Sequence, residues 1–584
     1  MRMRKTSVAS AATADPPAGA PARPPVTPWA LRTLYRFALR PLFGTGLYRA
    51  ALAGKAPSGF QVRPPAHWPG QAARGAAIAD GAFQLAGQTI RQLRNPWQAF
   101  DASEAWLTEL HGFGWLDDLI AYADGGDRTR AIGAARTLIL DWIARHRGWA
   151  WPAWRADVIG ARIAAWLTHF DAVFAGAEDA ERKAALDSLA RQLRHLRRVA
   201  GIEVEGGARL VALKGLIYGG TCLPDWAGVL PRTMQRITQE LDRQILPDGG
   251  HVERGPAMQL TVLRHLVDIR ALLRVAHREM PEGLQSAIDR MAPMVRFFRH
   301  ADGGLALFND SAESEPGWID RVLAEADARG RAPSRAPHSG FERLAIGRLF
   351  AIIDAGAPAP ARLDRHAHAG TLALEVDVGN TRVIVNCGPA PAADPAWRAA
   401  QRATAAHSTL AIDDTNSSEV LPGAESGLGR RPTRVLADRD EQEGHVWLFA
   451  SHDGYAHRFG LIHRRRLFLD AAGADLRGED SLDPVDPARP VGAHGFTVRF
   501  HLHPEIDASL VQDGTAVLLR LPGSGRNRPS GWWFRAEGGG LALADSIYLG
   551  SGETRRTQQI VISGVTGPSG VTVKWAMQQT DAAR

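Results

Sequence analysis

The sequence contains only two cysteines in 584 residues, Cys222 and Cys387. They lie far apart along the chain, so the disulfide framework that holds small secreted domains together is not expected. No uninterrupted apolar run is long enough to cross a membrane, so no transmembrane segment is expected. The basic first residues are followed, from Thr6 to Thr27, by an Ala/Pro-rich stretch without an apolar core. This composition predicts no secretory signal.

Charge of neither sign dominates strongly, but basic residues are in excess. Lys and Arg number 69 against 62 Asp and Glu, a net charge of +7. A basic balance suits a polyanionic partner. No helix-turn-helix, zinc-finger or RNA-binding motif accompanies it, so nucleic acid is not the expected partner and an acidic polysaccharide or oligosaccharide is favoured. The 17 tryptophans could stack on the C–H faces of sugars, although core packing accounts for most tryptophans.

Composition and periodicity divide the chain into four parts. Residues 1–27 are rich in Pro, Ala and small polar residues and are expected to be a disordered tail. Residues 28–330 have helical periodicity; Ile163, Leu167 and Phe170, for example, are spaced as on one face of a helix. Consecutive helix pairs with short connections predict an α-helical toroid, here incomplete. Residues 331–340 have the composition of a linker.

Residues 341–580 differ from the helical part because short alternating or β-branched runs are separated by turns rich in Gly, Asp and Pro. Many strands and few helices predict an antiparallel β-sandwich. The expected fold class is therefore α+β multidomain, with the toroid first and the sandwich second. A cleft between the two domains is the expected place for a ligand.

One stretch, residues 365–409, concentrates polar residues at the ends of two predicted strands. Residues 372–378 alternate apolar and polar side chains, which predicts a half-buried strand. Gly379-Asn380 is a turn dipeptide, and residues 381–385 form a second, β-branched strand. The ends of this hairpin carry His366, His368, Asn386 and His407.

Several motifs along the chain, taken in order, resemble those of the heparinase II/III-type polysaccharide lyases. The resemblance covers most of residues 30–580 and implies the same toroid-then-sandwich fold. The motifs are Arg162-Ile163 with Trp166-Leu167, the loop 246–254 (LPDGGHVER) with Pro256, the turn 308–311 (FNDS), His366-Ala-His368, the segment 402–407 (RATAAH) and the segment 451–455 (SHDGY).

The resemblance implies a β-elimination at a uronic acid, in which a base removes the C5 proton and the bond to the C4 oxygen breaks. Cations or amides must neutralise the neighbouring carboxylate, and a Tyr or His moves the proton. By its place in the motif, His366 is the catalytic candidate. The same resemblance implies no required cofactor but a possible structural zinc held by His368, Asn386 and His407. Asn386 stands where the family has Asp, and an amide oxygen is a poorer zinc ligand.

The helical half departs from the family pattern at two places. Ala208-Arg209 replaces the family's Asn-His, and Met258 stands near the place of its catalytic Tyr. Arg209 and Arg254 could instead clamp a carboxylate, and His251 could exchange protons. Two hypotheses therefore remain: a lyase with a rebuilt catalytic set (His366, His251, Arg254 and Arg209), or a protein that binds an acidic polysaccharide without cleaving it. They differ in whether these four side chains converge.

Further substrate contacts are expected from Trp151, Trp154, Tyr455 and Arg402, each of which could equally serve packing. The resemblance suggests the cell envelope or periplasm, whereas the missing signal pattern favours the cytoplasm. The oligomeric state cannot be read from the sequence.

Overall fold

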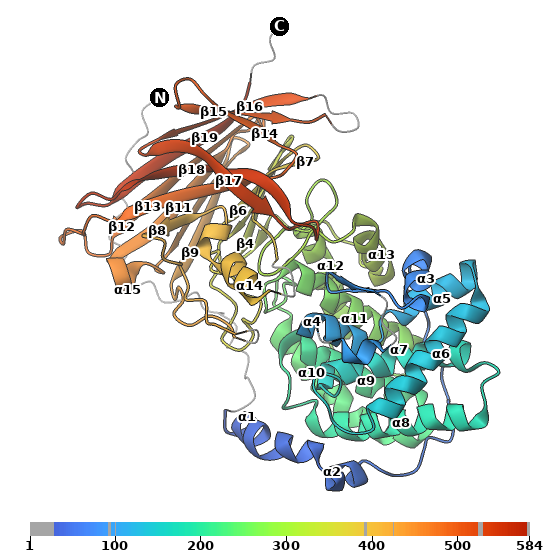
Figure 1. Ribbon diagram of the computed structural model, residues 1–584. Helices are drawn as coiled ribbons and strands as arrows, with labels where there is room; N and C mark the ends of the chain where they lie inside the picture. Colours follow the sequence, from blue (N-terminus) through green and yellow to red (C-terminus); the bar gives the residue numbers. More distant parts are fainter. Residues whose placement is uncertain are drawn as a thin grey trace.

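A computed structural model describes residues 29–91, 95–99, 101–389, 394–423, 426–523 and 529–580. The predicted disordered tail lies outside these residues. Helices come first and antiparallel strands second, so the predicted α-then-β architecture is confirmed (Figure 1). The last helix of the first part ends at Ala326 and the first strand of the second part begins at Arg335.

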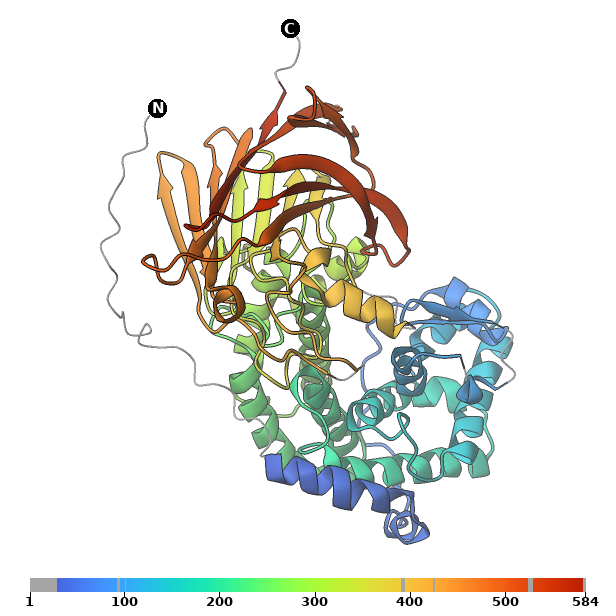
Figure 2. The same ribbon diagram turned by 60° about the vertical axis from the view of Figure 1, so that its left-hand side comes forward.

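The helical part curves round in an open ring (Figure 2). Its helices are α1 (Trp29–Leu34), α2 (Gly46–Ala51), α3 (Ala72–Ala79), α4 (Glu104–Gly112), α5 (Leu116–Gly125), α6 (Arg128–Arg145), α7 (Ala156–Phe174), α8 (Asp179–Val199), α9 (Gly206–Cys222), α10 (Leu230–Gln244), α11 (Pro256–Val275), α12 (Leu284–Phe297) and α13 (Pro316–Ala326). A small hairpin, β1 (Phe83–Leu85) with β2 (Gln88–Ile90), interrupts them and was not predicted. None of the described helices is long and apolar enough to span a membrane.

Close packing of α7 on α9 depends on two glycines. A Cβ on Gly160 would lie 2.3 Å from the carbonyl oxygen of Val211, and one on Gly215 would lie 2.5 Å from the Cα of Gly160. Only glycine permits backbones to approach this closely. The contact places α9, which begins at the domain junction, in the middle of the helical part.

The second part consists of two antiparallel sheets packed face to face. In one, the strand order is β14-β15-β16-β19-β12-β11-β10-β9; in the other it is β17-β18-β13-β7-β6-β5-β4-β3, with β8 beside β13. The strands are β3 (Arg335–Ala336), β4 (Phe341–Ile346), β5 (Leu349–Asp354), β6 (Leu374–Val378), β7 (Thr381–Val385), β8 (Leu410–Ile412), β9 (Val435–Gln442), β10 (His445–His452), β11 (Leu461–Leu469), β12 (Asp475–Pro484), β13 (Gly495–Leu502), β14 (Asp507–Val511), β15 (Ala516–Leu521), β16 (Ser530–Glu537), β17 (Gly540–Tyr548), β18 (Arg555–Val565) and β19 (Val571–Gln579). Apolar side chains of both sheets form one core, as in other sandwiches.

Strand β6 differs from the sequence-based prediction, because it is buried on both faces rather than on one. Its polar residues, Glu375 and Asp377, face the helical part and bind His300, which lies just after α12. The alternating pattern predicted that one face of this strand is exposed to solvent. In the structure the helical part covers that face.

Aromatic packing joins the two parts as well. Phe341 of β4 lies edge-on to Phe298, with ring centroids 4.9 Å apart, and also packs against Phe308. Phe350 and Ile352 of β5 belong to the same apolar cluster as the helices. The helical core therefore continues into the sandwich, and the junction is a packed interface.

Candidate functional site at the domain junction

His366 forms the most accessible polar pair at the junction. Its Nδ1 lies 2.7 Å from Oδ2 of Asp310, and Arg398 Nη1 lies 3.7 Å from the same oxygen. The His366 side chain is 36% exposed. Burial alone would raise the pKa of Asp310, but the hydrogen bond with His366 and the nearby cationic groups outweigh it and hold that pKa well below its usual value. The carboxylate is therefore ionised and orients the imidazole.

Four segments meet around this pair. The Ala257 amide donates to Oγ of Ser311, and the His368 amide donates to Oδ1 of Asn309. A Cβ on Gly207, in the first turn of α9, would lie 2.6 Å from Sδ of Met258, in the first turn of α11. The thioether of Met258 thus packs on the start of α9, and Met258 is the residue that we expect near the place of the family's tyrosine.

Arg209 and His251 are bound to partners within the helical part. Nη1 of Arg209 pairs with Glu240 at 3.1 Å, and its Nε donates to the carbonyl of Val204. His251 is 1% exposed, and its Nε2 is hydrogen-bonded to the side chain of Gln244 at 3.0 Å. Burial lowers the pKa of His251. Both side chains hold the helical part together.

Arg254 lies at the junction, where its guanidinium group is bound to other residues of the chain. Its guanidinium donates to the carbonyls of Ser339 and Gly340 and forms a buried ion pair with Asp354 of β5 at 2.5 Å. The side chain of Asp354 is only 6% exposed. The four predicted catalytic side chains therefore do not converge: each is bound to a different partner, and only His366 is substantially exposed.

Three of the four expected substrate contacts are buried. Trp154 is 1% exposed, Tyr455 is fully buried and donates to the carbonyl of Leu410, and Arg402 is 2% exposed. Arg402 donates to the carbonyls of Ala367, Ser426 and Gly427. Their contacts correspond to the packing alternative. Trp151 is half-buried, with the guanidinium of Arg40 4.4 Å from its ring.

The residues expected to hold zinc do not form a suitable donor set. Nδ1 of His368 lies 3.1 Å from Nε2 of His407, and Nδ1 of His407 donates to the carbonyl of Ala403. The amide of Asn386 is already used, since its Oδ1 accepts from the Ser408 amide and its Nδ2 donates to Glu375. Within the described residues no cluster of three or more His, Cys, Asp or Glu side chains is arranged for a metal. Two imidazoles without a carboxylate or thiolate are a poor match for structural zinc.

A groove of about 920 Å³ lies between the two domains, beside Arg254. Its helical wall comes from the end of α10 and from α12, and its sandwich wall from the segment 335–342, the loop 355–360 and the start of β9. The lining includes the basic side chains of Arg243, Arg290 and Arg335, with Asp242 and Glu342 among them. Its size is that of a ligand-binding site.

The sequence motifs do not include Arg398, Arg243, Arg290 or Arg335, and they place Asp310 only in a turn. Arg335 lies in the predicted linker, to which no functional residue was assigned. Asp310 lies 56 residues before His366 in the chain, and no local pattern connects them. The acidic turn 308–311 was the one available signal, because it belongs to the family motifs.

Comparison with known families agrees with this architecture. Residues 86–327 match the family described as Heparinase II/III N-terminus, and residues 328–578 match Heparinase II/III-like, C-terminal. The solved structure of heparinase III superposes with a TM-score of 0.71 at 14% identity, covering 95% of this chain and 92% of that one. Heparan sulfate lyase HepC from Pedobacter heparinus gives 0.57 at 14% identity, covering 92% and 88%. At these identities the structures show the fold alone.

A curated relative is more similar in sequence. FtsZ-localized protein C of Caulobacter vibrioides (strain NA1000 / CB15N) is 34% identical over 557 residues, which cover 93% of this chain and 94% of that protein. The two family matches together span most of the chain, in the order in which the helical part and the sandwich occur. The chain therefore belongs to the heparinase II/III family, whose fold it shares with polysaccharide lyases.

Proposed function

We propose that this chain is a non-catalytic member of the heparinase II/III family that binds an acidic glycan in the groove between its two domains. The observation that carries the proposal is Met258 packed on Gly207 at the start of α9. A thioether can neither remove the C5 proton of a uronate nor protonate the leaving oxygen, which are the two proton transfers of β-elimination.

The partners of the two arginines support the same conclusion. Elimination requires a group that neutralises the substrate carboxylate while negative charge develops. Arg209 is paired with Glu240 and Arg254 with Asp354, both in buried positions. Withdrawing Arg254 toward a substrate would leave the buried carboxylate of Asp354 without its counter-charge, at a cost of about 3–5 kcal/mol. Withdrawing Arg209 would leave Glu240 with Arg243 alone, whose Nη1 lies 3.0 Å from the same carboxylate oxygen.

Binding, in contrast, needs only complementary charge and shape. Arg243, Arg290 and Arg335 line one groove, and the chain carries a net charge of +7. Nε of Arg290 is buried without a hydrogen-bond partner among the described residues, so it retains a donor. Guanidinium groups bind carboxylates and sulfates through paired hydrogen bonds.

The test measures cleavage and binding on the same protein. Purified protein is incubated with heparan sulfate, alginate and polygalacturonate while ultraviolet absorbance is followed, because elimination creates an absorbing C4–C5 double bond. Binding is measured in parallel by calorimetry at low and high salt. We expect flat absorbance and saturable binding to at least one polymer, weakened at least tenfold by Arg290→Ala with Arg335→Ala. Arg464→Ala, at an exposed arginine of β11, is the matched control and leaves binding unchanged. Absence of binding to every polymer would refute the proposal.

The alternative is a lyase with His366 as the base. The 2.7 Å contact between His366 and Asp310 favours it, because a partly exposed imidazole oriented by a carboxylate can act as a general base. Rising absorbance that disappears in His366→Ala would establish this lyase and exclude the non-catalytic function.

The relative from Caulobacter vibrioides supports a proposal about the cellular setting. Identity of 34% along nearly the whole of both chains favours a shared role, so we propose that this chain also localises with FtsZ. Localisation with FtsZ would decide between the two expected compartments, since the chain would then occupy the compartment of FtsZ.

Co-sedimentation tests this setting directly. Purified chain is centrifuged with FtsZ polymers assembled with GTP and, as control, with unassembled FtsZ and GDP. We expect the chain in the pellet only with polymers, and a fluorescent fusion at midcell that disperses when FtsZ is depleted. A fusion that stays at midcell without FtsZ, or is never found there, would contradict the proposal.

A further inference from the structure

The first described segment, from α1 to α2 (residues 29–51), concentrates exposed apolar side chains and is called the N-terminal segment below. Among the described residues, six of the fourteen exposed large apolar side chains lie in this short stretch, each between 36% and 86% exposed: Leu31, Leu34, Phe37, Leu39, Leu42 and Leu47. Apolar side chains scattered singly over a surface need no explanation, but a group of them in one place marks a contact with a protein or a membrane.

Helical spacing gives the N-terminal segment an outer and an inner face. Leu31, Leu34 and Phe37 follow one another at intervals of three residues, so they neighbour one another on one side of the helix. The inner face carries Tyr35 and Phe43, which are only 6% and 7% exposed. The segment therefore has two apolar faces, and the rest of the protein covers only one of them.

Contacts of the inner face fix the N-terminal segment to the helical part. The ring centroid of Phe43 lies 4.5 Å from that of Tyr48 and 5.0 Å from that of His195 in α8. The hydroxyl of Tyr48 lies 2.7 Å from Nδ1 of His195, and the hydroxyl of Tyr35 donates to the carboxylate of Glu203. Because these contacts hold the inner face on the protein, the leucines of the outer face stay directed to solvent.

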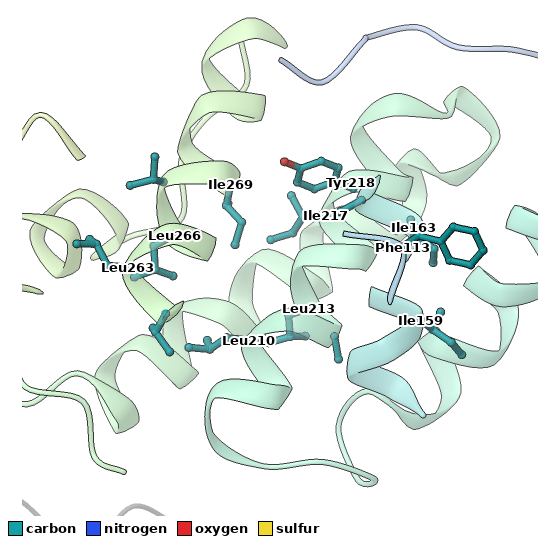
Figure 3. Close-up of a cluster of buried hydrophobic side chains, with 14 of the residues drawn as sticks. Phe113, Ile159, Ile163, Leu210, Leu213, Ile217, Tyr218, Leu263, Leu266 and Ile269 are labelled. Carbon is teal, nitrogen blue, oxygen red and sulfur yellow. The ribbon is translucent and has the colours of Figure 1, made fainter. Parts of the chain in front are cut away.

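The exposed leucines are not part of the core of the helical part. That core lies between α7, α9 and α11, where Ile159, Leu213 and Leu266 are at most 1% exposed (Figure 3). Figure 1 and Figure 2 both show the N-terminal segment along the outside of the ring, at the end of the molecule away from the sandwich. No other element of the described chain covers its outer face.

Charge in the N-terminal segment and the residues just after it has one sign. Residues 29–55 contain four arginines and one lysine but no Asp or Glu. Arg49 and Lys55 are exposed, and so is Arg198 of α8, whose guanidinium lies 5.5 Å from the ring centroid of Tyr48. Exposed leucines beside exposed cations are typical of segments that bind an anionic lipid surface.

Two other occupants of the outer face fit less well. In a symmetric dimer of this chain the patch would meet its own copy, so the exposed Arg49 and Lys55 of the two copies would repel each other. Residues 1–28 contain no Leu, Ile or aromatic residue and a single acidic one, Asp15, so they offer little apolar surface or complementary charge. A lipid surface supplies both an apolar layer and negative headgroups.

We propose that the N-terminal segment binds the surface of a membrane that contains anionic lipids. α1 and α2 have six residues each, whereas a membrane-spanning helix needs about 20. The segment therefore lies along the surface, with its leucines at the boundary between headgroups and acyl chains. The site is separate from the groove and from His366, so the proposal is independent of glycan binding and of localisation with FtsZ.

The experiment is flotation of the full-length protein with lipid vesicles in a density gradient. Vesicles of phosphatidylcholine and phosphatidylglycerol in equal parts are the anionic probe, and vesicles of phosphatidylcholine alone are the neutral comparison. We expect the protein to bind the anionic vesicles at least tenfold more tightly than the neutral ones. This binding should weaken as salt is raised, because salt screens the attraction between the cations and the headgroups. Equal binding to both kinds of vesicle, or none to either, would overturn the proposal.

Two matched double variants locate the lipid contact. Phe37→Glu with Leu47→Glu places charges at the two most exposed positions of the outer face and should weaken vesicle binding at least tenfold, with a thermal midpoint that shows the protein to be folded. Phe449→Glu with Leu510→Glu makes the same two changes at exposed positions of the sandwich and leaves binding unchanged. Vesicle binding that survives the first pair of changes would refute the proposed site. A wild-type dimer that the first pair separates, without any binding to vesicles, would refute the lipid surface in favour of a second copy of the chain.

Discussion

His300 offers the sharpest test of how the two domains are joined. It lies just after α12 with no exposed side-chain surface, between two buried carboxylates of β6. Nε2 is 2.7 Å from Glu375 and Nδ1 is 2.8 Å from Asp377. Burial alone would lower the pKa of His300, but Asp377 and Glu375 outweigh it and raise the pKa to about 9. The imidazolium therefore bridges the helical part to the sandwich at neutral pH.

The magnitude follows from this pKa. A rise from 6.5 to about 9 corresponds to about 3 kcal/mol of extra stability for the charged form in the folded protein. Because the folded pKa lies above the unfolded one, this contribution is complete below about pH 6.5 and is lost as the pH rises through 9. His300→Gln also removes the cation that contacts Glu375 and Asp377 directly, so we expect a loss of about 3–5 kcal/mol at pH 6.

The assay is urea unfolding followed by circular dichroism at pH 6, 8 and 10. The difference in unfolding free energy between wild type and His300→Gln should be largest at pH 6 and shrink above pH 9. His457→Gln, at an exposed histidine of α15 (Ala456–Phe459), is the control and should change stability by less than about 0.5 kcal/mol. The reasoning fails if His300→Gln is as stable as the control at pH 6, or if its deficit is the same at all three pH values.

Three further outcomes are expected. Arg254→Ala should lower the unfolding free energy, measured by urea titration, by about 3–5 kcal/mol, because it leaves the buried carboxylate of Asp354 without its ion-pair partner. An effect below about 1 kcal/mol would show that this ion pair is not needed for stability. Tyr455→Phe should cost about 1 kcal/mol in the same assay, since the Leu410 carbonyl loses its donor, and an unchanged midpoint would contradict that role. Added zinc or a chelator should leave the melting temperature unchanged, because His368 and His407 lack a carboxylate co-ligand; a zinc-dependent rise would contradict this.

The two-part architecture was predictable because its signals are local. Helical spacing of Ile163, Leu167 and Phe170 depends only on the period of the α-helix, and the alternation in residues 372–378 depends only on that of a strand. What these periods could not predict was the burial of the polar face of β6. That face is covered by His300, which lies 75 residues before Glu375 in the chain.

The candidate site was predictable only in part. The motif His366-Ala-His368 predicted His366 as a candidate, and the helical motifs predicted that the family's Tyr is missing. The expected roles of Arg209, His251 and Arg254 depended on where their side chains point. Each has a buried partner that the local sequence does not predict: Glu240 for Arg209, Gln244 for His251 and Asp354 for Arg254. A charged residue in a motif can therefore serve the scaffold as well as a ligand.

The sequence by itself determined the order of helices and strands and the family, because periodicity and motifs are properties of neighbouring residues. Only the tertiary structure decided that Arg209 and Arg254 are paired within the protein, that His366 is oriented by Asp310, and that a groove forms between the two domains. The physical reason is that an ion pair or a cavity wall depends on distances in space, and the fold brings together side chains separated by many residues.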